Sequence, residues 1–144
     1  MNYTIWALIG MVSYSLVPLL VKLATRSGQL STFIVLVIAT VIVAVTVLSI
    51  VILNGELKIL SATDFTRSSA LYAYATGIAL TLAVSSFFQA LSLGPASVVV
   101  PIYGMFIVGG SILGIFILDE PVTIRKLIGI GLAAISVLFI AGRS

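Results

Sequence analysis

Cysteine and histidine are both missing from this sequence of 144 residues. Their absence excludes disulfide bonds, thiolate or imidazole metal ligands, cysteine nucleophiles and histidine bases. Charge is also scarce, because charged residues make up only 8% of the chain, against about 25% in a typical soluble domain. So few charges cannot cover a surface that faces water. The composition therefore predicts a protein whose solvent is the lipid bilayer.

The few acidic residues all lie between apolar runs: Glu56, Asp64, Asp119 and Glu120. Catalysis inside a membrane needs acids, bases or metals at that depth, so we expect no enzyme activity, no metal site and no cofactor. The basic residues are scattered along the chain beside apolar runs, which is usual for membrane spans. We therefore expect no nucleic acid among the partners.

Apolar runs divide the chain into five candidate spans, since a spanning helix needs about 20 mostly apolar residues. They predict an all-α membrane protein, a bundle of five transmembrane helices in a single transmembrane domain, residues 1–144. The expected helices cover residues 3–23, 31–53, 69–93, 95–118 and 123–141. Gly94 and Pro95 separate the third helix from the fourth, because glycine favours the position after a helix and proline the first helical position.

Two prolines lie inside the predicted spans, Pro18 in the first and Pro101 in the fourth. A proline within a helix removes one backbone hydrogen bond and frees the carbonyl four residues earlier, here on Tyr14 and Ser97. A free carbonyl is costly in hydrocarbon unless protein or water satisfies it. We therefore expect both proline faces to point inward, with Pro18, Pro101 and Gly104 acting as helix hinges.

Small and polar residues follow one face of the first, third and fourth predicted helices, at steps of about one turn. The third helix has the clearest stripe: Gly77, Thr81, Ser85 and Gln89. Two interpretations remain open, close helix packing with hydrogen bonds across the seam and a shared cavity for a small polar solute. The cavity interpretation names these substrate-binding candidates: Tyr14, Ser85, Gln89 and Tyr103. The amide and the two phenols favour it, because they are larger than close packing needs and both donate and accept hydrogen bonds.

Small residues four positions apart predict a second kind of contact. Gly110 and Gly114 in the fourth helix allow two backbones to approach closely, and Gly129 and Ala133 repeat the spacing in the last helix. We expect these residues at helix-packing seams or at the face of a dimer.

The basic residues carry little information on orientation. Lys58, Arg67, Arg125 and Lys126 share the side of the N-terminus, and Lys22, Arg26 and Arg143 lie on the other side, which is four against three. An excess of lysine and arginine normally marks the cytoplasmic side. Either the N-terminus lies inside by this small excess, or the chain inserts in both orientations and pairs with an inverted copy.

Three segments resemble a known family: the alanine-serine entry PASVVVP, the turn LDEPVT and the opening RKLIGIG of the last helix. With five spans, the chain resembles one EamA-like unit of the drug/metabolite transporter superfamily over nearly its whole length. Asp119 stands where the family usually has glycine. The resemblance implies one half of an inverted-repeat transporter, because full-length members carry two such units of opposite topology.

The resemblance also implies a function and partners. It implies movement of small metabolites or amino acids across the cell inner (cytoplasmic) membrane by a multi-pass protein. We expect the second half to come from an inverted copy in an antiparallel homodimer with dual topology, or from a paired half-size subunit.

The related small multidrug resistance proteins exchange protons for drugs through a glutamate in their first helix. The first span here, WALIGMVSYSLVPLL, has no carboxylate, and no span centre carries an ionisable group. We therefore expect transport without a membrane-embedded carboxylate for proton coupling. The alternatives are a non-transporting membrane subunit of a larger complex and an exporter of the small-multidrug-resistance type.

Overall fold

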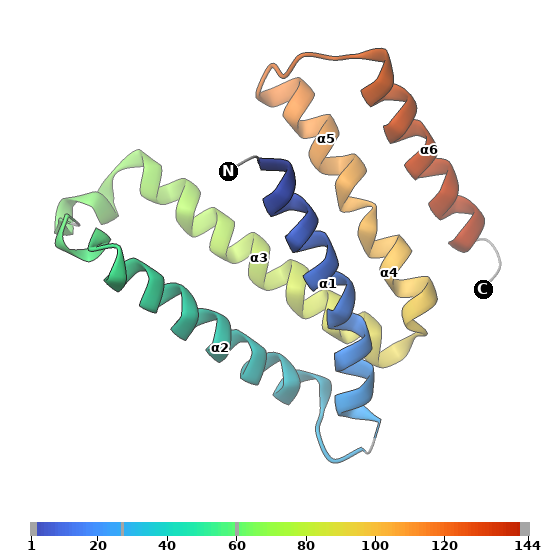
Figure 1. The fold of residues 1–144 in the computed structure, drawn as a ribbon, viewed down its shortest axis with the longest axis horizontal. Coiled ribbons are helices and arrows are strands. Elements are labelled where there is room, and N and C mark those ends of the chain that lie inside the picture. The colour runs from blue at the N-terminus through green and yellow to red at the C-terminus, as the bar shows by residue number, and fades with distance from the viewer. Residues whose placement is uncertain (1–2, 27, 60, 142–144) are drawn as a thin grey trace. The chain divides into compact units, whose positions relative to one another are not determined.

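The computed structural model describes residues 3–26, 28–59 and 61–141. Every regular element among these residues is helical (Figure 1). The helices are α1 (Tyr3–Thr25), α2 (Thr32–Leu53), α3 (Ser68–Leu93), α4 (Ala96–Gly104), α5 (Phe106–Ile117) and α6 (Ile124–Ala141), with two short 3₁₀ helices, η1 (Glu56–Lys58) and η2 (Ala62–Thr66), between α2 and α3. Arg143, which entered the count of basic residues, lies outside the described residues.

Helix bounds agree with the predicted ranges to within two residues, the largest shift being the end of α1 at Thr25 instead of residue 23. The fourth predicted helix, residues 95–118, differs in kind, because the structure divides it into α4 and α5 at Met105. The amide of Met105 donates to the carbonyl of Ile102 (3.2 Å), which is a tighter turn than an α-helix makes. Pro101 lacks an N–H and Gly104 is a poor helix former, so this segment is the weakest part of the span.

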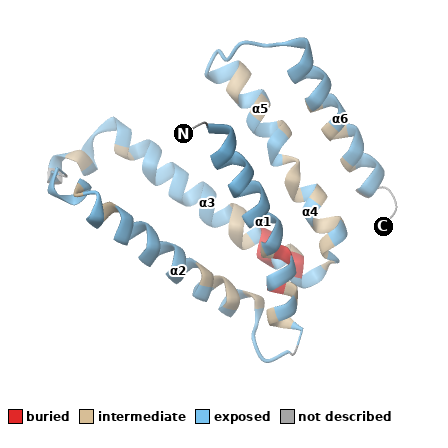
Figure 2. Cartoon of the chain, in the orientation of Figure 1, coloured by how far each residue is buried: buried red, intermediate tan, exposed pale blue. Residues whose placement is uncertain are grey.

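Among the described residues, four segments are long and apolar enough to cross a membrane: α1, α2, α3 and the stretch Ala96–Ile117 that contains α4 and α5. Their apolar side chains are mostly exposed, and α2 has no buried residue at all (Figure 2). Such exposure is the expected state of helices whose solvent is hydrocarbon. A membrane crossing by α6, the fifth predicted span, stays a prediction.

Backbone contacts divide the chain into two compact units, Met1–Ser92 and Leu93–Ser144. The prediction of a single domain stays a prediction. In the first unit α1 packs against α2. Among the residues of this unit whose burial is described, the buried ones belong to α1 and α3 (Figure 2): Pro18, Val21, Phe87, Phe88 and Leu91. In the second unit α6 packs against both α4 and α5.

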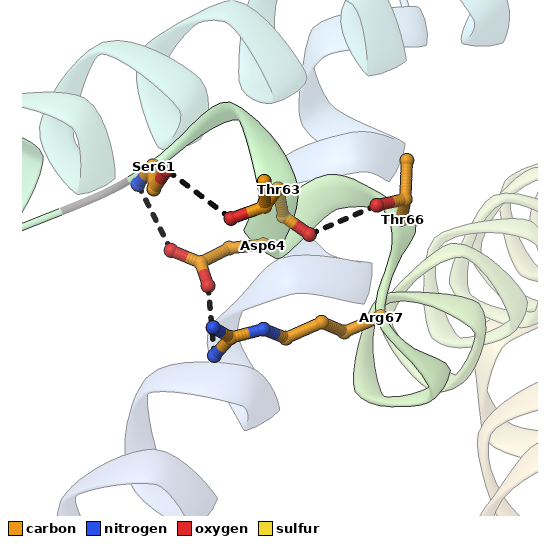
Figure 3. Close-up of polar contacts among 5 residues, drawn as sticks. All are labelled: Ser61, Thr63, Asp64, Thr66 and Arg67. Atoms are coloured by element: carbon orange, nitrogen blue, oxygen red, sulfur yellow. Dashed lines mark hydrogen bonds and ion pairs between the residues drawn. The ribbon is translucent and has the colours of Figure 1, made fainter.

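A small polar network shapes the connection between α2 and α3 (Figure 3). The amide of Ser61 donates to Asp64 Oδ2 (2.9 Å), and Asp64 Oδ1 pairs with Arg67 Nη1 (2.9 Å). Beyond the network, the hydroxyl of Tyr74 on α3 donates to the carbonyl of Phe65 in η2 (3.0 Å). These contacts satisfy backbone groups locally and hold η2 against the first turns of α3.

Candidate functional site

The polar stripe of α3 consists of two parts with different chemistry. The hydroxyl of Thr81 donates to the carbonyl of Gly77 (2.8 Å), so its hydrogen-bonding capacity is used within the helix. Ser85 is half-buried and Gln89 is exposed. Within the part of the chain that the structure describes, neither of these two side chains makes a hydrogen bond. A hydroxyl and an amide one turn apart are therefore available to water, a solute or a partner chain.

An open hollow of about 540 Å³ runs along the N-terminal half of α3. It is lined by Ala73, Tyr74, Gly77, Ile78, Thr81 and Leu82. All six residues belong to one helix, so this hollow is an exposed helix face with small residues at its centre. It contains the first two residues of the stripe, and the available polar pair lies one to two turns further along α3.

Tyr14 lies on a different side of α3 from this polar pair. Its ring stacks on the ring of Phe87, with the centroids 6.1 Å apart and the planes at 21°. Gln89 follows Phe87 by two positions, and two steps of about 100° place their side chains roughly 160° apart around the helix. Within the first unit the structure therefore places Tyr14 against the buried core of α1 and α3. Its role in binding a substrate stays a prediction.

Pro18 is buried, one turn after Tyr14 in the same helix. The face of α1 that carries it therefore points into protein, as its freed backbone carbonyl requires. The helix runs unbroken through this proline. Hinges at Pro18, Pro101 and Gly104 stay predictions, although the helix that contains Pro101 is interrupted at Met105.

The second unit contains the remaining substrate-binding and hinge candidates. Pro101, Tyr103 and Gly104 are half-buried and lie in the last turns of α4, directly before the interruption at Met105. The ring of Tyr103 meets the ring of Phe106 edge to face, with centroids 5.7 Å apart at 61°. This aromatic contact spans the interruption, because Phe106 is the first residue of α5. The joining of Tyr103 and Gln89 in one binding site stays a prediction.

The small-residue pairs differ in what surrounds them. A side chain added at Gly110 or Gly129 would meet nothing within 4 Å, so both positions are open. At Gly114 an added Cβ would lie 3.4 Å from Cδ of Glu120, so this glycine already accommodates a side chain of its own chain. Ala133 is half-buried on α6. Contacts of these residues with a second subunit stay a prediction.

Sequence reasoning did not single out the residues that form the core of the first unit. Phe87, Phe88 and Leu91 are 1%, 4% and 1% exposed. The rings of the two phenylalanines meet edge to face at 6.4 Å. The available signal was an aromatic pair followed three residues later by leucine, directly beside the polar stripe. In a helix that is apolar on every side, that signal does not stand out.

Charged groups lie at the ends of the helices and not within the spans. Two ion pairs join described residues, Arg67 with Asp64 at 2.9 Å and Lys126 with Glu120 at 3.5 Å. Among the described residues no group of three acidic side chains is placed to hold a metal ion. The chemistry offered inside the spans is therefore that of neutral donors and acceptors: hydroxyls, an amide and backbone carbonyls.

Comparison with known proteins identifies a family for this chain. The family model described as the EamA-like transporter family matches residues 1–142. No curated protein and no solved structure matches the chain. The family match covers nearly the whole chain and confirms the resemblance drawn from the turn LDEPVT and the segments on either side of it. The chain belongs to the EamA-like transporter family and is a multi-pass membrane transporter of the drug/metabolite superfamily.

Proposed function

We propose that this protein moves small metabolites or amino acids across the cell inner (cytoplasmic) membrane. The observation that carries the proposal is the pair Ser85 and Gln89, whose side chains make no hydrogen bond among the described residues. An amide with no hydrogen-bond partner costs several kcal/mol in hydrocarbon. A polar residue within a span is therefore usually turned towards a water-filled cavity or a substrate.

We propose that a second unit of opposite topology completes the binding site, and that an inverted copy of this chain supplies it. Two observations support this arrangement. The available polar pair lies on a face of α3 that the first unit leaves largely open, since Gln89 is exposed. The basic residues are also nearly balanced between the two sides, so insertion in both orientations costs little.

Transport in this proposal proceeds down a concentration gradient and is not coupled to protons. Proton-coupled carriers use acids or histidines at membrane depth, and this chain has none in the centres of its spans. The solute is recognised by neutral groups, which suits zwitterionic or uncharged polar molecules better than strongly charged ones. The interruption at Met105, just after Pro101 and Gly104, provides the flexible point that alternating access requires.

Liposomes test the transport proposal directly. Purified protein is reconstituted into liposomes loaded with an equimolar mixture of the twenty common amino acids, and mass spectrometry follows the compounds that leave. We expect a subset of amino acids to leave faster than from protein-free liposomes, at a rate that an imposed pH gradient does not change. Release equal to that of protein-free liposomes contradicts amino-acid transport, and a rate that follows the pH gradient contradicts uncoupled movement.

Orientation is tested separately, because the chain has no native cysteine. A Ser144→Cys variant in intact cells is treated with a membrane-impermeant maleimide before and after permeabilisation. An antiparallel dimer predicts labelling of about half of the molecules from outside. Labelling of all or none of them contradicts dual topology, whatever the liposome experiment shows.

A further inference from the structure

The turn after α5 folds back onto that helix. Asp119 has a φ of 52°, in the left-handed region, and this reverses the chain. The amides of Leu118 and Glu120 both donate to the carbonyl of Gly114, at 3.2 and 3.3 Å. The Glu120 side chain thereby lies over Gly114, where an added Cβ would be in ordinary van der Waals contact with its carboxyl carbon at 3.4 Å. The carboxylate therefore reaches back to α5 at the level of Gly114.

Lys126 connects this carboxylate to α6. Its Nζ lies 3.5 Å from Glu120 Oε2 and donates to the carbonyl of Pro121 at 3.2 Å. Lys126 belongs to the first turn of α6, which contains no acidic residue. The positive end of a helix disfavours a cation there, so the stability of α6 alone does not explain this lysine. Its contacts with the preceding turn do explain it, because they join the end of α5 to the start of α6.

This connection matters because α6 lies beside a span whose helix tightens for one residue at Met105, where φ is −59° and ψ is −14°. It packs against both α4 and α5, and these two segments meet at the interruption at Met105. If this span bends there, α6 cannot keep both of its contacts. The contacts of Glu120 with Gly114 and Lys126 add to the packing of α6 against α5. They add nothing to the packing of α6 against α4.

We propose that Glu120 is a positioning residue that fastens α5 to α6, so that these two helices move as one body about Met105 while the contact between α6 and α4 opens. Glu120 reaches no substrate in this proposal and acts only through the two helices that it joins. The rigid-body motion is a property of the second unit by itself. Its use in a transport cycle rests on the proposed function.

Distance measurements between spin labels test the proposal, since the absence of native cysteines permits selective labelling. One pair of cysteines replaces Leu113 on α5 and Leu132 on α6, and a second pair replaces Ile102 on α4 and Leu138 on α6; all four residues are exposed. The protein is studied at full length in lipid nanodiscs. We expect a single narrow distance distribution for the α5–α6 pair and a broader or divided one for the α4–α6 pair.

Glu120→Gln and Lys126→Gln are each expected to broaden the α5–α6 distribution. An ion pair this exposed is a modest contact, so broadening by about twofold and not unfolding is expected. The double exchange of Glu120→Lys with Lys126→Glu should restore a narrow distribution. Asp119→Asn is the matched control, because it removes the neighbouring charge and asparagine tolerates the left-handed backbone. It should leave both distributions unchanged.

Two results overturn the proposal. One is an α5–α6 distribution that is unchanged in both glutamine variants. The other is a wild-type protein in which the α5–α6 distances are broad and the α4–α6 distances narrow, since α6 would then move with α4. Neither readout uses a solute, so a failure of the proposed transport function leaves this test intact. Conversely, Gln89→Leu should impair transport without changing either distance distribution.

Discussion

α2 and α3 are both apolar helices long enough to cross the membrane, yet their polar side chains differ in hydrogen bonding. On α2, Thr40, Thr46 and Ser49 each donate a hydrogen bond of 2.8 Å to the carbonyl one turn earlier. On α3, Thr81 does the same, whereas Ser85 and Gln89 make no such bond within the described residues. α2 also buries nothing, while α3 contributes three buried side chains to the first unit.

This difference between α2 and α3 shows which polar side chains can be used as evidence for a polar passage. A serine or threonine hydroxyl that bonds the carbonyl four residues back is satisfied in lipid, so its presence in a span indicates nothing about water. The amide of glutamine has two donors and an acceptor, and one bond to its own helix cannot satisfy them all. Within the predicted polar stripe of α3, Ser85 and Gln89 are therefore the residues that support a polar passage.

The largest expected effect distinguishes the buried side of α3 from the surface of α2. Phe87 is 1% exposed, and Phe87→Ala removes most of a packed ring, which we expect to cost about 3 kcal/mol of unfolding free energy. Unfolding of purified protein in mixed micelles measures it. Phe33→Ala is the matched control, because Phe33 on α2 is 50% exposed and its loss should cost about 0.5 kcal/mol or less. Equal losses in the two variants would contradict a core between α1 and α3.

A smaller effect is expected for the side-chain amide of Gln89. Gln89→Leu keeps the approximate volume of the side chain and removes its donors and acceptor. We expect solute release from liposomes to slow about tenfold, which corresponds to about 1.4 kcal/mol of lost recognition in the transition state. Thr46→Val on α2 is the control and should change the rate by less than about twofold, because its hydroxyl is already satisfied. An equally large loss in the control would place α2 at the passage as well.

The smallest expected effect concerns the connection between α2 and α3. Asp64 accepts from the amide of Ser61 and pairs with Arg67, each at 2.9 Å. Asp64→Asn keeps an acceptor oxygen and removes the charge, so we expect η2 to lose about 0.5 kcal/mol of local stability. Hydrogen exchange at the Ser61 amide should become roughly twofold faster.

Glu56→Gln provides the control for this connection, since Glu56 lies in η1 and its side chain accepts a hydrogen bond from Asn54 (3.2 Å), not from a residue of η2. It should leave the exchange of Ser61 unchanged. Unchanged exchange in Asp64→Asn itself would mean that the capping contact does not hold η2.

Much of the fold follows from the sequence because lipid makes strong demands on local structure. A run of about 20 apolar residues has to be helical to satisfy its backbone. The ends of these runs are also marked chemically, for example by Gly94 and Pro95 between α3 and α4. Pro101 and Gly104 predict a hinge in the fourth span, and the structure interrupts the helix beside them at Met105; movement at that point stays a prediction.

The core was harder to predict. A bilayer is as apolar as a protein interior, so hydrophobicity does not distinguish a packed face from a lipid-facing one. Phe33 and Phe87 are chemically identical, but one is half exposed and the other is buried. At Tyr14 the donor and acceptor predict solute contact, and the structure stacks the ring on Phe87 while leaving the residue 44% exposed, so its role in binding stays a prediction.

Composition and spacing by themselves determined the solvent, the helices, the turns and the family of this protein, since each depends on residues that are close together in the chain. Tertiary structure alone decided which phenylalanines form a core, which polar side chains stay available, and that Glu120 lies over Gly114. These outcomes depend on how one helix face meets another segment. In a chain that is apolar on nearly every face, geometry and not hydrophobicity selects the pairing.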